Sequence, residues 1–150
     1  MPQSLVQNFQ HTVFSTKDRF RWIDEDWEEA LFIQIGGIQN RLGCKLIAAG
    51  AWYDHIHLLS MINRKLAVPE FVSKVKSSSS FWIHKNIPGR KKFAWQRGYS
   101  SFSVSRSNIP AVRRYIKNQR NHHHGQGFES ELRLLLAKHG LEYDERYLWN

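Results

Sequence analysis

Two histidines, His55 and His57, stand one residue apart in the segment AWYDHIHLLSMI, residues 51–62. Side chains of a β-strand alternate between its two faces, so both imidazoles would point the same way, about 7 Å apart. Neutral imidazole is a good ligand for divalent metals, and the pair could therefore bind one ion. A His-x-His pair is also common as a buried structural feature, and the pair alone does not decide between these interpretations.

A second group of reactive side chains follows in AVRRYIKNQRNHH, residues 111–123. Tyr115 and Gln119 are four residues apart, which on a helix places them on the same face. The glutamine offers a neutral oxygen ligand, and a tyrosine beside a metal-bound phosphate could attack it. The alternative is a tyrosine packed in the core and a solvated glutamine. The basic residues around them, Arg113 and Arg114 included, leave little apolar surface and suit a DNA strand.

Positive charge is concentrated in the middle of the chain. The net charge is +9, and residues 64–120 hold fourteen Lys/Arg but only one acid, Glu70. Such a basic segment predicts a face that attracts polyanions, nucleic acid first; solubility alone and an anionic membrane surface are weaker alternatives. We predict phosphate contacts from Lys74, Lys76, Lys85, Arg90, Lys91, Lys92, Arg113 and Arg114.

Length and composition favour a globular protein. At 150 residues and 41% hydrophobic content, we expect one domain spanning residues 1–150. No run of about 18 apolar residues is present, and the first residues lack the pattern of a secretion signal. The single cysteine, Cys44, is expected to be a core residue. These features predict a cytoplasmic protein with no membrane association.

The chain alternates strand-like and helix-like segments. Trp27, Leu31, Ile35 and Ile38 repeat at helical spacing within residues 24–43, and the four serines at 77–80 fall inside a second predicted helix. Strands are predicted at 8–16, across 44–62 and at 99–105, and helices at 24–43, 67–86, from Asn108 and at 128–140. This is the β-α-β-β-α-β order of a ferredoxin-like (RRM-like) α+β fold, with an antiparallel sheet behind two helices. A further helix carrying Tyr115 and a short C-terminal helix follow.

Together these segments resemble a known family. DHIHLL (54–59) is similar to the histidine–hydrophobic–histidine motif of the HUH superfamily of single-strand DNA-nicking enzymes. With VPEFVSKVKSSSS, FAWQRGYSSFSVS, VRRYIKNQ and HGLEYDERYLWN, nearly the whole chain resembles the small single-tyrosine insertion-sequence transposases of the two-hundred type, which include REP-associated relatives.

The resemblance implies a site and a reaction. His55, His57 and Gln119 would hold a Mg²⁺ or Mn²⁺ ion, and Tyr115 would be the nucleophile. The enzyme would cut single-stranded DNA next to a subterminal hairpin, leave a 5′-phosphotyrosine link and a free 3′-OH, and rejoin strands through that link. It would act as a homodimer whose sheets join and whose active sites are shared between subunits, in the prokaryotic cytoplasm with the nucleoid.

Several alternatives remain at this stage. The chain could be a domesticated REP-associated nickase, a hairpin-binding module that does not cut, or a metal-dependent hydrolase that uses a bound water. Asp54 could support His55 from behind or simply form a turn. The run His122–His124 is expected to be a solvated helix end, with His122 closest to the face of Gln119.

Overall fold

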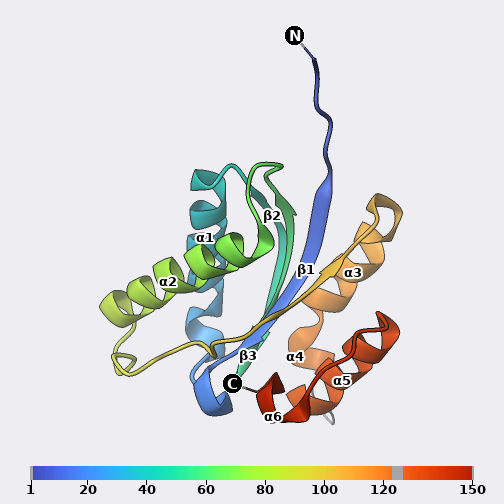
Figure 1. The fold of residues 1–150 in the computed structure, drawn as a ribbon. Helices are drawn as coiled ribbons and strands as arrows, with labels where there is room; N and C mark the ends of the chain where they lie inside the picture. Colours follow the sequence, from blue (N-terminus) through green and yellow to red (C-terminus); the bar gives the residue numbers. More distant parts are fainter. Residues whose placement is uncertain (1, 123–126, 150) are drawn as a thin grey trace.

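A computed structural model describes residues 2–122 and 127–149 of the chain (Figure 1). The four strands are β1 (Asn8–Ser15), β2 (Lys45–Trp52), β3 (His55–Ile62) and β4 (Ser100–Ser103). The helices are α1 (Glu25–Arg41), α2 (Val68–Asn86), α3 (Ile109–Lys117), α4 (Gln119–His122), α5 (Phe128–Lys138) and α6 (Glu145–Leu148), with short 3₁₀ turns at Lys17–Arg19 and Arg106–Asn108. His123 and His124 of the predicted helix end lie outside the described residues.

The strands form one antiparallel sheet in the order β2-β3-β1-β4. β1 lies in the middle, where it pairs with β3 and β4, and β2 pairs with the outer side of β3. The predicted α+β fold with an antiparallel four-stranded sheet is confirmed. Among the described residues, no helix is both long and apolar enough to cross a membrane.

The alternation of β3 divides its side chains between two layers. Ile56 and Leu58 face the large hydrophobic core formed with α1 and α2, whereas His55 and His57 face the opposite side. Figure 1 shows α1 and α2 together on one side of the sheet. The two histidines are therefore held by a strand whose other face is fixed in the core.

The first two helices begin and end close to their predicted bounds. Asp24 precedes α1, and Gly43, at φ +73, follows its C-terminal end, where an L side chain would be strained. Pro69 occupies the first turn of α2, and the serine run 77–80 is helical rather than a linker. Cys44 is buried, as expected of a core residue.

Additional helices cover the second face of the sheet. On this face, α5 packs Phe128, Leu132 and Leu136 against Val13 of β1 and Phe102 of β4. The same face holds α3, whose Ile116 packs on Ala48 of β2 and Leu59 of β3. The sequence predicted these helices but did not assign them to a face; in Figure 1 they lie on the side of the sheet opposite α1 and α2.

The helix expected to carry both Tyr115 and Gln119 is interrupted. α3 ends at Lys117, and Gln119 is the first residue of α4, so the prediction of one continuous helix is wrong. The N–H of Asn118 faces the carbonyls of Arg114 and Tyr115 in a tightened turn. The two side chains nevertheless stay close, because the break is only one residue long.

Candidate active site

His55 and His57 point together at one carboxylate. The Nε2 atoms of His57 and His55 lie 2.6 Å and 3.3 Å from the same oxygen, Oε1 of Glu131. Both histidines are fully buried, and Glu131 is 2% exposed. These three donor atoms lie within 4.8 Å of one another. Two imidazoles and a carboxylate are a ligand set that divalent metals accept, so this group could hold a metal ion.

The outer nitrogen of each ring also has a partner. Nδ1 of His55 donates to Oδ1 of Asp54 at 2.7 Å, and Nδ1 of His57 shares a hydrogen bond of 2.8 Å with Nε2 of His11. Metal-binding histidines commonly have such an outer partner, which fixes the ring and its tautomer. Asp54, left open between a turn residue and a supporting residue, lies in the turn between β2 and β3 and also bonds His55; its role in supporting a metal site stays a prediction.

Tyr115 joins this cluster from α3. Its ring lies 5.7 Å from that of His57 and 6.1 Å from that of His11, centroid to centroid. Burial and the negative charge and hydrogen bond of Glu131 raise the pKa of the Tyr115 phenol, while a hydrogen bond with Gln119 acts in the opposite direction. The phenol is therefore protonated at neutral pH and must lose its proton as it reacts.

The imidazoles differ in charge preference. Burial lowers the pKa of His55, but the hydrogen bonds and charges of Asp54 and Glu131 together outweigh burial and raise it. Burial, followed by the charge of His57, lowers the pKa of His11 well below its usual value. His11 is consequently neutral and can exchange a hydrogen bond with His57 without adding charge to the site.

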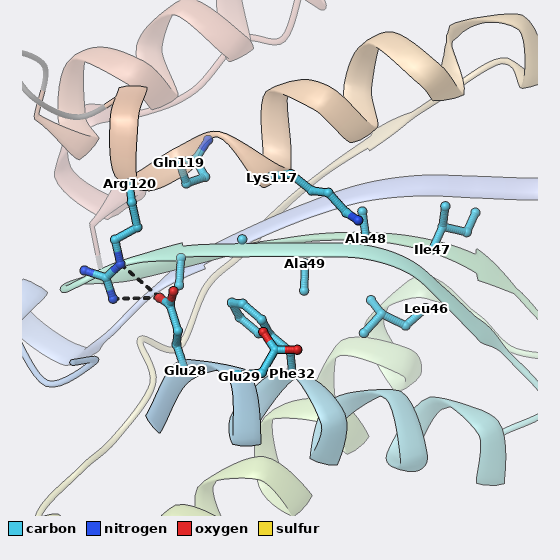
Figure 2. Close-up of a pocket in the computed structure, with 12 residues that line it drawn as sticks. Glu28, Glu29, Phe32, Leu46, Ile47, Ala48, Ala49, Lys117, Gln119 and Arg120 are labelled. Atoms are coloured by element: carbon cyan, nitrogen blue, oxygen red, sulfur yellow. Dashed lines mark hydrogen bonds and ion pairs between the residues drawn. The ribbon is translucent and has the colours of Figure 1, made fainter. Parts of the chain in front are cut away.

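Gln119 lies at the rim of this cluster. It is buried, its amide lies 3.5 Å from the carbonyl oxygen of Tyr115, and it also lines a cavity of about 420 Å³ along β2. Figure 2 shows Gln119 near Lys117 and Arg120, with Arg120 paired to Glu28 of α1. Arg120 thereby ties α4 to the layer on the far side of the sheet.

The structure thus brings together His55, His57, Tyr115 and Gln119, the four residues chosen from the sequence. Their roles in metal binding and catalysis remain predictions. A smaller cavity of about 210 Å³ reaches Tyr115 and His11 between α3 and α5, with Lys138 and His139 also in its lining.

Two members of the cluster, Glu131 and His11, were missed in the sequence. Glu131 occupies the buried face of α5 between Phe128 and Leu132, where an acid is unexpected, and that position was the available signal. His11 is on the same strand face as Val13, and its burial among apolar neighbours gave a similar but weaker signal.

The predicted DNA-contacting residues are divided between two layers. Arg113 and Arg114 are exposed on α3, close to the candidate site. Lys76 already donates to the carbonyls of Gln96, Arg97 and Gly98, and Arg90 pairs with Asp24 and the Trp22 carbonyl. Lys74, Lys85, Lys91 and Lys92 are exposed on α2 and the loop after it, on the opposite side of the sheet from the histidines.

The sequence matches one protein family over most of its length. The family model described as "Transposase IS200 like" matches residues 5–119. The transposase for insertion sequence element IS200 of Salmonella typhimurium is 29% identical over 119 residues, which cover 73% of this chain and 74% of that protein. The ISDra2 transposase TnpA of Deinococcus radiodurans is 24% identical over 114 residues, covering 73% and 81% respectively.

Solved structures share the fold. A proposed transposase of Deinococcus radiodurans R1 has a TM-score of 0.64 at 23% identity, covering 79% of this chain and 98% of that one. A REP-associated tyrosine transposase bound to a REP hairpin has a TM-score of 0.60 at 11% identity, covering 83% and 73%. The family match ends at Gln119, so α5 and Glu131 lie beyond it.

Proposed function

Because this chain belongs to the IS200-like transposase family, we propose that it cuts and rejoins single-stranded DNA next to hairpins, with Tyr115 as its nucleophile. The observation that carries the proposal is the contact of the half-buried Tyr115 ring with His57, which is fully buried beside His55. A hydrolase that uses a bound water would not need a tyrosine hydrogen-bonded within the metal-binding group.

The proposed reaction conserves the phosphodiester bond energy. The phenol oxygen of Tyr115 attacks the scissile phosphorus, the bond from phosphorus to the 3′ oxygen breaks, and that oxygen leaves as a free 3′-OH. The phenol gives up its proton to a base in the same step. When a 3′-OH later attacks the 5′-phosphotyrosine, the tyrosine leaves and the strands are joined, so no ATP is required.

His55 and His57 would hold the divalent ion, Mg²⁺ or Mn²⁺, with Gln119 as the third ligand expected from the sequence. Such an ion would offset the negative charge that develops on the phosphate during attack. The hydrogen bonds of Asp54 to Nδ1 of His55 and of His11 to Nδ1 of His57 fix the orientation of the two rings, so that both Nε2 atoms face the proposed ion.

The proposed substrate is supported by charge and by one relative. The basic middle segment suits a nucleic-acid backbone, and a protein of the same fold is a REP-associated tyrosine transposase bound to a REP hairpin. A domesticated nickase would share this chemistry. Imperfect hairpins flanking the gene would identify a mobile element, whereas hairpins scattered through the genome would identify a domesticated one.

We also propose a homodimer, since joining two DNA ends calls for two active sites held together. β2 is an edge strand, and an edge strand can pair with a second chain. The sharing of active sites between subunits, which the family resemblance implies, stays a prediction. Within one chain, Tyr115 already lies beside His57 of the same chain.

The test is the covalent adduct. Wild-type protein incubated with a single-stranded hairpin substrate and Mg²⁺ should give a protein–DNA species on a denaturing gel, and Tyr115→Phe should give neither adduct nor cleavage. Tyr143→Phe, at an exposed tyrosine near the C-terminus, is the matched control and should behave as wild type. Normal cutting by Tyr115→Phe would refute the proposal; binding without cutting by the wild type would favour a binding module.

A further inference from the structure

A cavity of about 210 Å³ between α3 and α5 adjoins the proposed nucleophile. The rings of Tyr115 and His11 form part of its lining, and both rings also contact His57. Pockets that bind drug-sized ligands measure about 300–1,000 Å³, so this cavity suits one planar ring system rather than a larger ligand or a segment of protein. A ring bound here would lie beside the phenol of Tyr115.

The lining of this cavity combines apolar walls with a positive charge. Val104, Val112 and Leu135 supply apolar surface, which suits the two faces of an aromatic ring. Among the described residues that line it, none is acidic, whereas Lys138 contributes a cation. The cavity therefore favours a planar, largely apolar group that is joined to negative charge. The base of a nucleotide meets this description, because its sugar joins it to a phosphate.

Two polar side chains in the lining could bond the edge of such a base. Nδ1 of His139 donates to the carbonyl of Leu135 at 2.8 Å, and its ring stacks on Phe102 with 4.3 Å between centroids. These contacts fix the imidazole and leave its Nε2 atom available to a ligand.

Asn108 is the second of these side chains. It precedes α3 and is exposed, and within the described part of the chain its amide neither caps the helix nor bonds another side chain. A side-chain amide carries a donor beside an acceptor, which matches the amino group and N7 of adenine, whereas guanine presents two acceptors at the same edge. Asn108 is therefore suited to distinguish one purine from the other.

We propose that this cavity binds one unpaired base of the DNA strand, the base next to the phosphate that Tyr115 attacks, and that Asn108 makes adenine the preferred base. The inference rests on the proposed function only for the identity of that phosphate. A base bound here holds its nucleotide at two points, the ring in the cavity and the phosphate at the phenol. The phosphorus is thereby oriented for attack, and the base beside it contributes to the choice of the cleaved bond.

Occupancy of the cavity is tested without cleavage. 2-Aminopurine, a fluorescent purine that keeps N7, replaces one nucleotide at a time in the single-stranded flank of a hairpin oligonucleotide, and each oligonucleotide is bound to the wild-type protein in the presence of chelator. Fluorescence should change at one position, that of the responding base, much more than at the positions on either side, because enclosure against aromatic side chains alters the emission. Equal changes at all positions would overturn the proposal.

Filling the cavity should abolish this response. Leu135→Trp fills it from α5, and Val112→Phe fills it from α3 as a second variant. Leu134→Trp is the matched control, since Leu134 is 62% exposed on the same helix and lies outside the lining. Circular dichroism checks that each variant is folded. A response that persists in both filled variants would overturn the proposal.

The role of Asn108 is tested by adduct formation with adenine, guanine or an abasic sugar at the responding position. Wild type should react about tenfold faster with adenine than with guanine, and Asn108→Ala should lose this preference while matching wild type on the abasic strand. Asn40→Ala, exposed on α1, is the control and should keep the preference. If Asn108→Ala slows all three substrates equally, its role is structural and adenine selection is refuted.

The position of the cut tests where the base lies. The responding base should be one of the two that flank the cleaved phosphate, as mapped by the length of the product strand. A responding base several nucleotides away would overturn the placement of the cavity beside the attacked phosphate.

The outcomes separate this inference from the proposed function. A base enclosed by wild type but not by Leu135→Trp, with no Tyr115 adduct, would refute the proposed reaction but leave the base-binding site intact. Normal adduct formation with no enclosed base would refute the base-binding site but leave the reaction intact.

Discussion

At the scale of single residues, the site depends on groups that hydrogen-bond the Nδ1 atoms of the histidines and so fix the orientation of the rings. Asp54 holds the outer nitrogen of His55, and loss of such a partner typically weakens metal binding by roughly 10–100-fold. We expect Asp54→Asn to lower Mn²⁺ affinity by about tenfold, since an amide oxygen still accepts but carries no charge. Asp26→Asn, exposed in the first turn of α1, is the control; equal affinities in a Mn²⁺ titration would contradict the role given to Asp54.

The sequence predicted four of the six members of this cluster, and it missed the other two for a physical reason. Strand alternation and helical spacing show which side chains share a face, so His55 was paired with His57 and Tyr115 with Gln119. Neither pattern shows which distant segment will face them. The contact of His11 with His57 spans 46 residues, and it depends on which strands become neighbours in the sheet. Glu131 depends in addition on the face that α5 covers.

Lys76 gives a prediction about stability and pH. Burial lowers its pKa from 10.5 to about 8, although its ammonium donates to three carbonyls. Between pH 8 and 10.5 the unfolded chain then binds more protons than the folded one, so this residue makes the free energy of unfolding rise with pH. Lys76→Met should lack this rise.

Urea unfolding of both proteins below pH 8 and near pH 10.5 checks this prediction, because all other titrating groups are common to the pair. The free energy of unfolding of wild type minus that of Lys76→Met should be larger at the higher pH. If this difference is smaller instead, the hydrogen bonds to the carbonyls favour the charged ammonium more strongly than burial disfavours it. That result would also leave Lys76 less available for the predicted phosphate contact.

At the scale of elements, Gly50 of β2 allows the end of α3 to approach the sheet. A Cβ atom at this position would lie 1.8 Å from the carbonyl oxygen of Ile116 and 3.1 Å from Cγ of Gln119. Gly50→Ala should therefore push the α3–α4 turn outward, lower the free energy of unfolding by about 1–3 kcal/mol and displace Tyr115 from the histidines.

Gly36→Ala is the matched control for this change. Its Cβ would meet only Leu46 Cδ2 at 3.8 Å, and alanine in a helix interior is better than glycine by roughly 0.5–1 kcal/mol. We expect it to raise stability and leave adduct formation unchanged. Urea unfolding and the adduct assay, run where both variants are folded, check the pair; full adduct formation by Gly50→Ala would contradict the close approach.

Prediction from sequence was strongest for the core elements and weakest for the helices added to them. The apolar stripe of α1 and the alternation of β3 each have one face that must be buried, which determines the ferredoxin-like sheet. By contrast, the break at Asn118 was not predicted; it lies where the end of α3 approaches Gly50 of β2, a contact that local spacing does not show.

At the scale of the whole molecule, the net charge of +9 predicts salt-sensitive DNA binding. Log affinity for single strands should fall with log salt by about 0.7 for each phosphate neutralised. Arg113→Gln, on the exposed face of α3, should reduce that slope by about one phosphate contact. Arg146→Gln is the control, since Arg146 is paired with Asp144 at the far C-terminal end; a slope unchanged in Arg113→Gln would remove Arg113 from the DNA surface.

The last prediction concerns which subunit supplies the nucleophile. In one chain, Tyr115 already lies beside His57 and is hydrogen-bonded to Glu131, so each subunit can form its own site. A mixture of Tyr115→Phe and His57→Ala proteins tests this, because neither has a complete site of its own. If sites form within one chain, the mixture should give no more adduct than the separate proteins.

The opposite result has a different meaning. The tyrosine of one subunit could instead complete the metal site of the other. A mixed dimer would then hold one intact site: the His57→Ala chain supplies Tyr115, and the Tyr115→Phe chain supplies both histidines. Adduct would then reappear on mixing, attached only to the His57→Ala chain, which a mass tag on one protein would reveal. Such rescue would mean that α3 leaves its own sheet in the dimer and that the packing of Ile116 against Ala48 and Leu59 is remade on the partner. A control must show that the dimers in the mixture have exchanged subunits, and sedimentation with the mass tag on one protein provides it. Only then does the absence of adduct indicate a site formed within one chain.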